Sequence, residues 1–334
     1  MRICVLGAGA VGGLIGARLA AAGVETSALA RGATLDALRE HGWRLEQATA
    51  PDGSGGGLLT APVLATGDPA ELGVQDVVVL AVKAHALPAA LPVLAPLVGP
   101  DTAVVAAMNG VPWWFFEGFG GPCAGRRLDT VDPEGRIAAT VPVGNTVGCV
   151  VHLSASTPEP GLVRHHGGGR LILGEPDGTG SPRVRELAAV FGTAGFETEV
   201  STEIQRSVWY KLWGNMTMNP VSALTGATGD LILDDELVMA FCHNAMREAA
   251  AIGERIGCPV AERPEDRSQV TRKLGLTRTS MLQDAEAGRR LELDALVGAV
   301  REIGQRVQVP TPAIDALFAL TRLFARVRGL YPQH

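Results

Sequence analysis

The sequence predicts an α/β protein with a doubly wound, mostly parallel sheet in its N-terminal part and an all-α C-terminal domain. Up to about residue 201, short apolar runs alternate with helical segments, which is typical of parallel strands joined by right-handed crossovers. Beyond that residue, the segments carry helical periodicity with almost no strand signal. A chain of 334 residues is long enough for two domains, which we expect at 1–201 and 202–334.

The first domain should contain short buried strands with helices between them. The expected strands are the apolar runs at 3–6, 26–30, 77–82 and 103–107. The expected helices are at 10–22, 84–97 and 184–194. The run at 77–82 is apolar throughout and β-branched, which indicates a strand covered on both faces of a parallel sheet.

Later parts of the first domain should add strands without adding a ligand site. Residues 137–173 are β-branched and glycine-rich, so we expect extra strands there, and a final strand at 197–200. The glycine-rich stretch 51–57 precedes no helix, which favours a hairpin loop over a phosphate-binding turn. His165 and His166 have no carboxylate or cysteine at ligand spacing, so we expect a polar turn and no metal.

The second domain should be built from long helices only. Helical periodicity runs through residues 203–218, 235–256, 279–308 and 312–328. The last two segments are rich in alanine and leucine, which is compatible with a homodimer. No stretch of eighteen apolar residues suggests a membrane span, and the glycines and Arg18 in the apolar N-terminus argue against a signal peptide.

Composition narrows the class of protein. With 46% hydrophobic and 19% charged residues, the chain can bury a substantial core. Its net charge of −6 argues against a nucleic-acid-binding protein, whose affinity would come from a basic face. The five cysteines form no Cys-x-x-Cys pair, and a reduced cytoplasmic protein is the simplest interpretation.

A glycine motif opens the first helix. Gly7, Gly9 and Gly12 form the pattern Gly-x-Gly-x-x-Gly directly after the first strand. In a Rossmann-type domain the first glycine permits a tight turn, the second lets the backbone approach a pyrophosphate, and the third lets helix and strand pack closely. The helix N-terminus then favours the negative charge of the phosphates. The alternative is a purely structural glycine turn, but the position of the motif predicts dinucleotide binding by residues 1–201.

The end of the second strand indicates which nicotinamide cofactor would bind. An NAD site usually has an acidic residue there, whereas this chain has Arg31. A guanidinium can donate two parallel hydrogen bonds to a 2′-phosphate, and Lys83 at the end of another strand could add a second charge. We therefore favour NADPH, with two ordinary surface cations as the alternative.

The helix at 203–218 carries a polar stripe on an apolar background. Lys211, Asn215 and Asn219 are spaced by four residues, so they share one face if the helix persists to Pro220. Their neighbours are mostly tryptophan, leucine and methionine. A lysine and two amides in such surroundings suggest a stripe that lines a binding cleft. The alternative is a buried polar ladder that ties helices together.

Glu292 is a second candidate for chemistry. On a continuous helix its neighbours would include Ala285, Gly288 and Ala295, so its carboxylate would lie in a small apolar stripe. Burying a carboxylate is costly unless it has a partner. Pairing with Arg289 would make a structural ion pair, whereas pairing with a lysine across a cleft would make a catalytic pair.

These motifs together resemble the ketopantoate reductase family. The resemblance rests on the glycine motif, on Lys83 and on Asn109-Gly110. It also rests on two longer patterns, Lys211-Leu212-x-x-Asn215-x-x-x-Asn219-Pro220 and Thr279-Ser280-Met281-Leu282-Gln283-Asp284 followed by Glu292. The matches run in order through nearly the whole chain. They imply a Rossmann domain, a helical domain for substrate binding and dimerisation, and an active site between the two.

The resemblance also implies an activity and a role for each residue. NADPH would deliver a hydride to the C2 carbonyl of a 2-keto acid, and reduction of ketopantoate would place the protein in pantothenate biosynthesis. Lys211 would match the general acid and Glu292 its partner carboxylate. Asn215, Asn219 and Ser280 would bind the substrate, and Asn109 would lie near the nicotinamide.

Two departures from the family pattern keep other functions open. Residues 113–119 are unusually aromatic and could wall the substrate pocket, form a lid, or pack structurally. Thr228-Gly229 stands where some members offer an asparagine to the substrate. The alternatives are a reductase of a bulkier 2-keto acid, another two-domain hydroxyacid or opine-type dehydrogenase, and a non-enzymatic regulator that senses NADPH.

Overall fold

The computed structural model describes residues 1–48, 56–273, 275 and 277–333, and this part of the chain forms two compact units. The first unit comprises Met1–Met108 and Gly135–Ile204, and the second comprises Asn109–Glu134 and Gln205–His334. The chain thus passes into the helical unit three residues beyond the expected boundary. Residues 109–134, which we expected in the first domain, pack with the helices instead.

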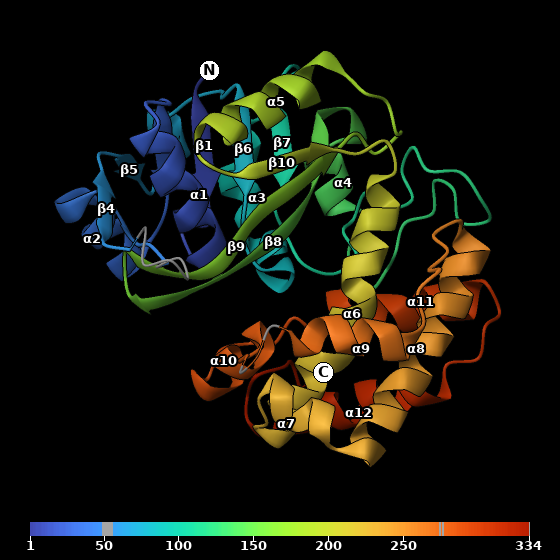
Figure 1. Ribbon diagram of the computed structural model, residues 1–334. Helices are drawn as coiled ribbons and strands as arrows, with labels where there is room; N and C mark the ends of the chain where they lie inside the picture. Colours follow the sequence, from blue (N-terminus) through green and yellow to red (C-terminus); the bar gives the residue numbers. More distant parts are fainter. Residues whose placement is uncertain (49–55, 274, 276, 334) are drawn as a thin grey trace. The chain divides into compact units, whose positions relative to one another are not determined.

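The first unit is built on one mixed sheet (Figure 1). Its described strands are β1 (Ile3–Leu6), β2 (Thr26–Leu29), β3 (Trp43–Glu46), β4 (Leu58–Ala61), β5 (Leu64–Thr66), β6 (Val77–Leu80), β7 (Ala103–Ala106), β8 (Thr146–Glu159), β9 (Leu162–Gly174) and β10 (Glu197–Val200). They lie in the order β4-β3-β9-β8-β7-β6-β1-β2-β5, with β10 beside β9. The run β5-β2-β1-β6-β7-β8 is parallel, which confirms the doubly wound sheet.

Two antiparallel pairs extend the parallel strands. β8 and β9 form a long hairpin, and β3 pairs antiparallel with β4. The antiparallel pairing of β3 and β4 is what the expected hairpin between residues 45 and 63 requires, while residues 49–55 lie outside the described part of the chain. His165 and His166 lie within β9, so the expected polar turn is wrong. Gly168, with φ +75°, accommodates a register shift in the β8–β9 ladder and keeps the strand continuous.

Five helices of the described first unit accompany the sheet: α1 (Ala10–Ala21), α2 (Gly32–His41), α3 (Leu87–Leu94), α4 (Arg136–Thr140) and α5 (Pro182–Thr193). An ideal Cβ at Gly16 would lie 2.4 Å from Trp43 Cζ2, and one at Gly13 would lie 2.7 Å from Val163 Cγ2. The glycines of α1 therefore let β3 and β9 pack closely against the helix. The expected helix at 84–97 is α3 flanked by two 3₁₀ turns, since two prolines interrupt it.

The second unit is helical in its described residues. Its helices are α6 (Ile204–Thr225), α7 (Gly229–Asp234), α8 (Glu236–Ile256), α9 (Pro264–Arg272), α10 (Ser280–Glu286), α11 (Ala299–Arg306) and α12 (Pro312–Val327), with a π-helical turn at Asp294–Gly298. The expected single helix at 279–308 is wrong. Gly288, with φ +65°, follows the end of α10, and a stretch without regular secondary structure precedes the π-helical turn.

The aromatic segment at 113–119 belongs to the core of the second unit. Trp114, Phe115 and Phe116 are almost fully buried. The ring of Phe115 lies 6.1 Å from that of Trp209 on α6 and 5.0 Å from that of Phe116. Burying such rings stabilises the folded state by about 1.5–3 kcal/mol each. This packing explains why the segment belongs to the second unit.

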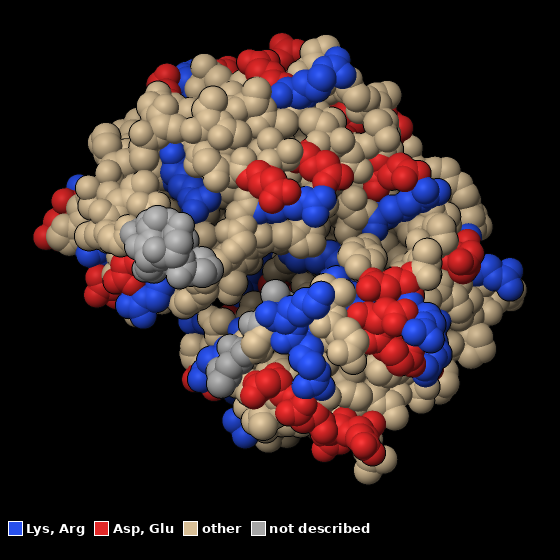
Figure 2. Space-filling view, in the orientation of Figure 1, with Lys and Arg blue, Asp and Glu red and all other residues tan. Residues whose placement is uncertain are grey.

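Charged side chains lie close together on the surface. Figure 2 shows basic and acidic side chains next to each other on one face. The ion pairs of the described residues include Arg170–Glu199 and Arg272–Asp234. The five cysteines are buried thiols that form no disulfide. Among the described residues, no helix combines the length and the apolar character needed to cross a membrane.

Candidate active site

The glycine turn of the first unit has the shape that a bound pyrophosphate requires. Gly7 has φ +100°, and a Cβ there would lie 2.8 Å from the Ala81 carbonyl carbon. A Cβ at Gly12 would lie 2.2 Å from the Gly7 carbonyl oxygen, so the turn and α1 close tightly on one another. At Gly9 a Cβ would meet no described atom within 4 Å, which leaves open space in front of the helix N-terminus. The turn therefore fits a dinucleotide.

Arg31 and Lys83 lie at the same edge of the sheet as the glycine turn. Leu6 of β1 is in register with Leu29 of β2 and with Leu80 of β6, so these three strands end together. Arg31 follows β2 and is exposed, and Lys83 follows β6 and is partly buried. The parallel topology thus gathers two cations at the edge where open α/β sheets bind their ligands.

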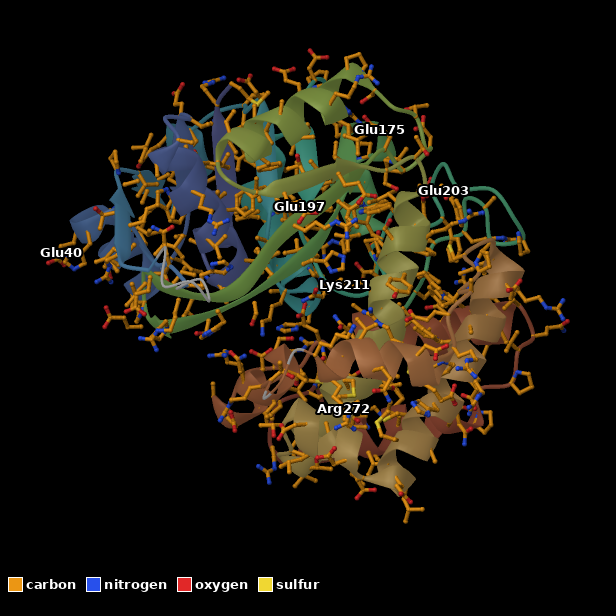
Figure 3. The ribbon with its side chains drawn as sticks, in the orientation of Figure 1. Glu40, Glu175, Glu197, Glu203, Lys211 and Arg272 are labelled. Carbon is orange, nitrogen blue, oxygen red and sulfur yellow. The ribbon has the colours of Figure 1, made fainter. Side chains whose placement is uncertain are left out.

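Lys211 is held on a helix that is otherwise mostly buried. It projects from the first half of α6 (Figure 3), with Trp209, Leu212 and Trp213 buried around it. The Trp213 indole donates a hydrogen bond of 2.7 Å to the Met246 carbonyl, which fixes α6 against α8. Lys211 is therefore a partly buried cation on a helix that is fixed by its apolar neighbours.

The partner of Lys211 comes from a segment more than a hundred residues earlier. Lys211 Nζ donates a hydrogen bond of 2.7 Å to Asn109 Oδ1. Both residues belong to the second unit, because residues 109–134 pack with the helices. The expected place of Asn109 near the nicotinamide stays a prediction, and the structure adds that its amide oxygen accepts a hydrogen bond from the lysine. Sequence spacing carries no signal for this contact.

The Asn109 segment is packed in turn against the segment that carries Glu292. The Val111 amide donates a 2.9 Å hydrogen bond to the Ala295 carbonyl. Gly110 lies so close to Ala295 that a Cβ would approach its carbonyl oxygen to 2.6 Å. Glu292 lies three residues before Ala295 and is 9% exposed. Lys211, Asn109 and the Glu292 segment therefore form one connected cluster within the second unit.

The surroundings of Glu292 differ from the helical stripe that we expected. Glu292 precedes the π-helical turn, so Ala285 and Gly288 are not on a common helix face with it. Arg289, the expected structural partner, forms its ion pair with Asp284 at 2.9 Å. The helical pattern does not extend to Glu292, because the helix ends before Gly288. The π-helical turn itself is a feature that recurs at functional sites.

The remaining expected site residues lie on the same unit. Helix α6 continues through Pro220 to Thr225, so Lys211, Asn215 and Asn219 do share one stripe. Asn219 is buried, and Asn215 is partly buried. Ser280 is the first residue of α10 and is exposed, while Thr279 caps that helix by accepting a hydrogen bond from the Leu282 amide.

Chemically, the second unit offers a cation with neutral polar neighbours and a buried carboxylate nearby. A confined ammonium stabilises negative charge on an oxygen and can then donate a proton to it. The amides of the α6 stripe can bind a polar substrate without adding charge. Combined with a dinucleotide-binding glycine turn in the first unit, these groups define the class of two-domain nucleotide-dependent oxidoreductases.

Comparison with known proteins identifies the family. The ketopantoate reductase PanE/ApbA domain matches residues 3–178, and its C-terminal domain matches residues 203–325. A 2-dehydropantoate 2-reductase of Mesorhizobium japonicum is 46% identical over 99% of this chain and 100% of its own. One of Halobacterium salinarum is 32% identical over 98% of this chain and 99% of its own.

Solved structures agree with the sequence relatives. A candidate ketopantoate reductase of Ralstonia solanacearum MolK2 superposes with a TM-score of 0.92 at 60% identity, covering 99% of both chains. The 2-dehydropantoate 2-reductase of Methylococcus capsulatus has a TM-score of 0.82 at 29% identity, covering 98% of both chains. The chain therefore belongs to the ketopantoate reductase PanE/ApbA family, as the resemblance predicted.

Proposed function

We propose that this protein reduces 2-dehydropantoate (ketopantoate) to pantoate with NADPH. The proposal rests on the hydrogen bond from Lys211 Nζ to Asn109 Oδ1. This bond orients a partly buried ammonium on α6. Family membership supports the reaction class, since relatives similar over their whole length are named 2-dehydropantoate 2-reductases.

Lys211 is the general acid of the proposed reaction. When a hydride reaches the C2 carbonyl carbon, negative charge develops on the carbonyl oxygen. An ammonium aimed at that oxygen stabilises the charge and then donates a proton, which yields the hydroxyl of the product. Asn109 accepts a hydrogen bond from one of the three N–H groups of the ammonium, which helps to orient it.

Glu292 keeps Lys211 charged and oriented. A carboxylate that is 9% exposed needs a cationic partner, and its segment is joined to that of Asn109 through Ala295. The carboxylate favours the protonated form of the lysine in the resting enzyme. After proton donation, the lysine takes up a proton from solvent, and the carboxylate stabilises the ammonium that forms.

The substrate and the cofactor are bound by separate sets of residues. Asn215, Asn219 and Ser280 supply neutral donors and acceptors for the polar groups of ketopantoate. Gly7, Gly9 and Gly12 suit the pyrophosphate of NADPH, and Arg31 and Lys83 suit its 2′-phosphate. The cofactor supplies the hydride when it is bound.

The test follows NADPH oxidation by the purified protein with ketopantoate and with a panel of bulkier 2-keto acids. Ketopantoate is expected to be the preferred substrate, because relatives similar over their whole length are named 2-dehydropantoate 2-reductases. If the protein clearly prefers a bulkier acid, the proposed reaction type stands but the proposed substrate is wrong. Binding of NADPH without turnover of any 2-keto acid would support the regulator instead.

The role of Lys211 is tested with Lys211→Ala and the matched variant Lys273→Ala. General acid catalysis contributes about 10²–10⁴-fold, so kcat should fall by about 10³-fold while the affinity for NADPH is retained. Lys273 is an exposed lysine directly after α9 in the same unit, and its replacement should leave kcat unchanged. Near-normal kcat in Lys211→Ala would contradict the mechanism.

A further inference from the structure

The last residues of the chain contact the segment that carries Glu292. The Leu291 amide donates a 3.0 Å hydrogen bond to the Leu330 carbonyl, one residue before Glu292. The Tyr331 hydroxyl donates a 2.5 Å hydrogen bond to Asp294 Oδ1, two residues after Glu292. Residues 329–333, here called the C-terminal tail, therefore bracket Glu292 from both sides along the sequence.

The C-terminal tail is anchored at its other side to α12. The Leu330 amide donates a 2.7 Å hydrogen bond to the Ala325 carbonyl, and Arg326 Nε donates a 2.9 Å hydrogen bond to the Pro332 carbonyl. The Arg326 guanidinium also lies 5.7 Å from the centre of the Tyr331 ring. A tail held at both ends can transmit the position of a rigid helix to the segment it touches.

Glu292 has need of such support, because its segment lacks regular helical hydrogen bonding. Residues 289–292 adopt no regular secondary structure between the end of α10 and the π-helical turn at Asp294–Gly298. Leu291, Leu293 and Leu330 are buried, so the tail covers an apolar as well as a polar contact. Burial raises the pKa of the Asp294 carboxyl, whereas the hydrogen bond from Tyr331 lowers it. Tyr331 therefore stabilises a carboxylate that its surroundings disfavour.

We propose that Tyr331 is a positioning residue for the reaction, acting through the C-terminal tail to hold Glu292 in place for Lys211. Tyr331 acts indirectly, through its hydrogen bond to Asp294. It fixes Asp294 at the start of the π-helical turn, and the Leu330 carbonyl fixes Leu291. With both flanking residues held, the Glu292 carboxylate keeps its direction. The inference rests on the catalytic role proposed for Glu292.

The first test compares Tyr331→Phe with Tyr210→Phe. Tyr210 is the other tyrosine of the chain, and its hydroxyl likewise donates to a carboxylate, Glu262 Oε2, at 2.6 Å. Because misplacement by 1 Å can cost about 10²-fold in rate, we expect kcat to fall by about tenfold in Tyr331→Phe. The KM for NADPH should change by less than about twofold, and Tyr210→Phe should retain kcat. Equal kcat in both variants would overturn the proposal.

Variants of Asp294 and Glu292 show whether the effect passes through the carboxylate. Asp294→Asn keeps an acceptor for the Tyr331 hydroxyl and should retain most of kcat, whereas Asp294→Ala should lose about tenfold. In a Glu292→Gln background, Tyr331→Phe should cause no further loss. Additive losses would mean that Tyr331 acts elsewhere. If Tyr331→Phe does not fold at the assay temperature, the Asp294 pair decides, and full activity of Asp294→Ala would overturn the proposal.

The same set separates this inference from the proposed function. If Glu292→Gln retains full kcat, the proposed role of Glu292 in catalysis is wrong, and the positioning of Glu292 has no purpose. If Glu292→Gln loses activity but Tyr331→Phe does not, only the inference about the tail is wrong. Melting temperatures of all variants show whether a loss of kcat reflects unfolding.

Discussion

Replacing Gly110 with alanine should damage stability and activity together, because this glycine joins two parts of the site. Gly110 follows Asn109, the acceptor for Lys211, and has φ +83°. An added Cβ would lie 2.6 Å from the carbonyl oxygen, 2.7 Å from the carbonyl carbon and 2.8 Å from the Cβ of Ala295. Two of these atoms are backbone atoms, so no side-chain rotation can relieve the contact.

The magnitude follows from two separate costs. An alanine in the left-handed region is less stable than glycine by about 1–2 kcal/mol. Forcing extra volume into a packed contact costs about 1–3 kcal/mol. We therefore expect Gly110→Ala to lower the free energy of unfolding by about 2–5 kcal/mol. Relief of the contact would move Asn109 away from Lys211, and a displacement of about 1 Å can lower kcat by about 10²-fold.

Gly125→Ala is the matched control for this variant. Gly125 lies in the same segment and unit and has φ +64°, but a Cβ there would meet no described atom within 4 Å. It should lose only the backbone contribution of about 1–2 kcal/mol and keep its kcat. Urea unfolding gives the stability of each variant, and NADPH oxidation with ketopantoate gives kcat. Equal stability and equal kcat in the two variants would refute the reasoning.

Three further variants probe the first unit. Arg31→Ala should weaken binding of NADPH far more than of NADH, measured by fluorescence titration; equal losses would argue against a 2′-phosphate contact. Burial lowers the pKa of His165 in the folded protein, so its stabilising contribution is present above the unfolded pKa and is lost as pH falls through the folded pKa. The melting temperature should therefore fall less between pH 7.5 and 5.5 in His165→Gln than in the wild type. Gly16→Val should destabilise the unit by about 1–3 kcal/mol or more, since Trp43 already occupies that space; an unchanged urea midpoint would contradict the packing.

Features that depend on local pattern could be predicted from the sequence. The strands β1, β6 and β7 are short apolar runs that are fully buried, and their burial is visible in their composition. The glycine motif falls at the turn between β1 and α1, where a Cβ would clash at Gly7 and at Gly12. The stripe of Lys211 and the two asparagines follows from helical spacing alone. In each case the residues that support the prediction lie within about ten positions of one another in the sequence.

Features that depend on long-range packing were decided only in the folded molecule. Residues 109–134 join the helical unit because their aromatic rings are buried there, and neither their composition nor their spacing says which domain they enter. The π-helical turn after Glu292 and the end of α10 at Gly288 replaced an apparently continuous helix. A periodic pattern cannot show where one glycine adopts a left-handed conformation.

The arrangement of the candidate site shows the same division. Its residue types could be chosen from the sequence, because a lysine, amides and a carboxylate on apolar elements are unusual and chemically competent. Their partners could not be chosen in this way. Lys211 is paired with Asn109 across 102 positions, and Tyr331 reaches Asp294 across 37. A hydrogen bond between distant segments depends on how whole helices pack, and that packing is set by the sum of many weak contacts rather than by any local signal.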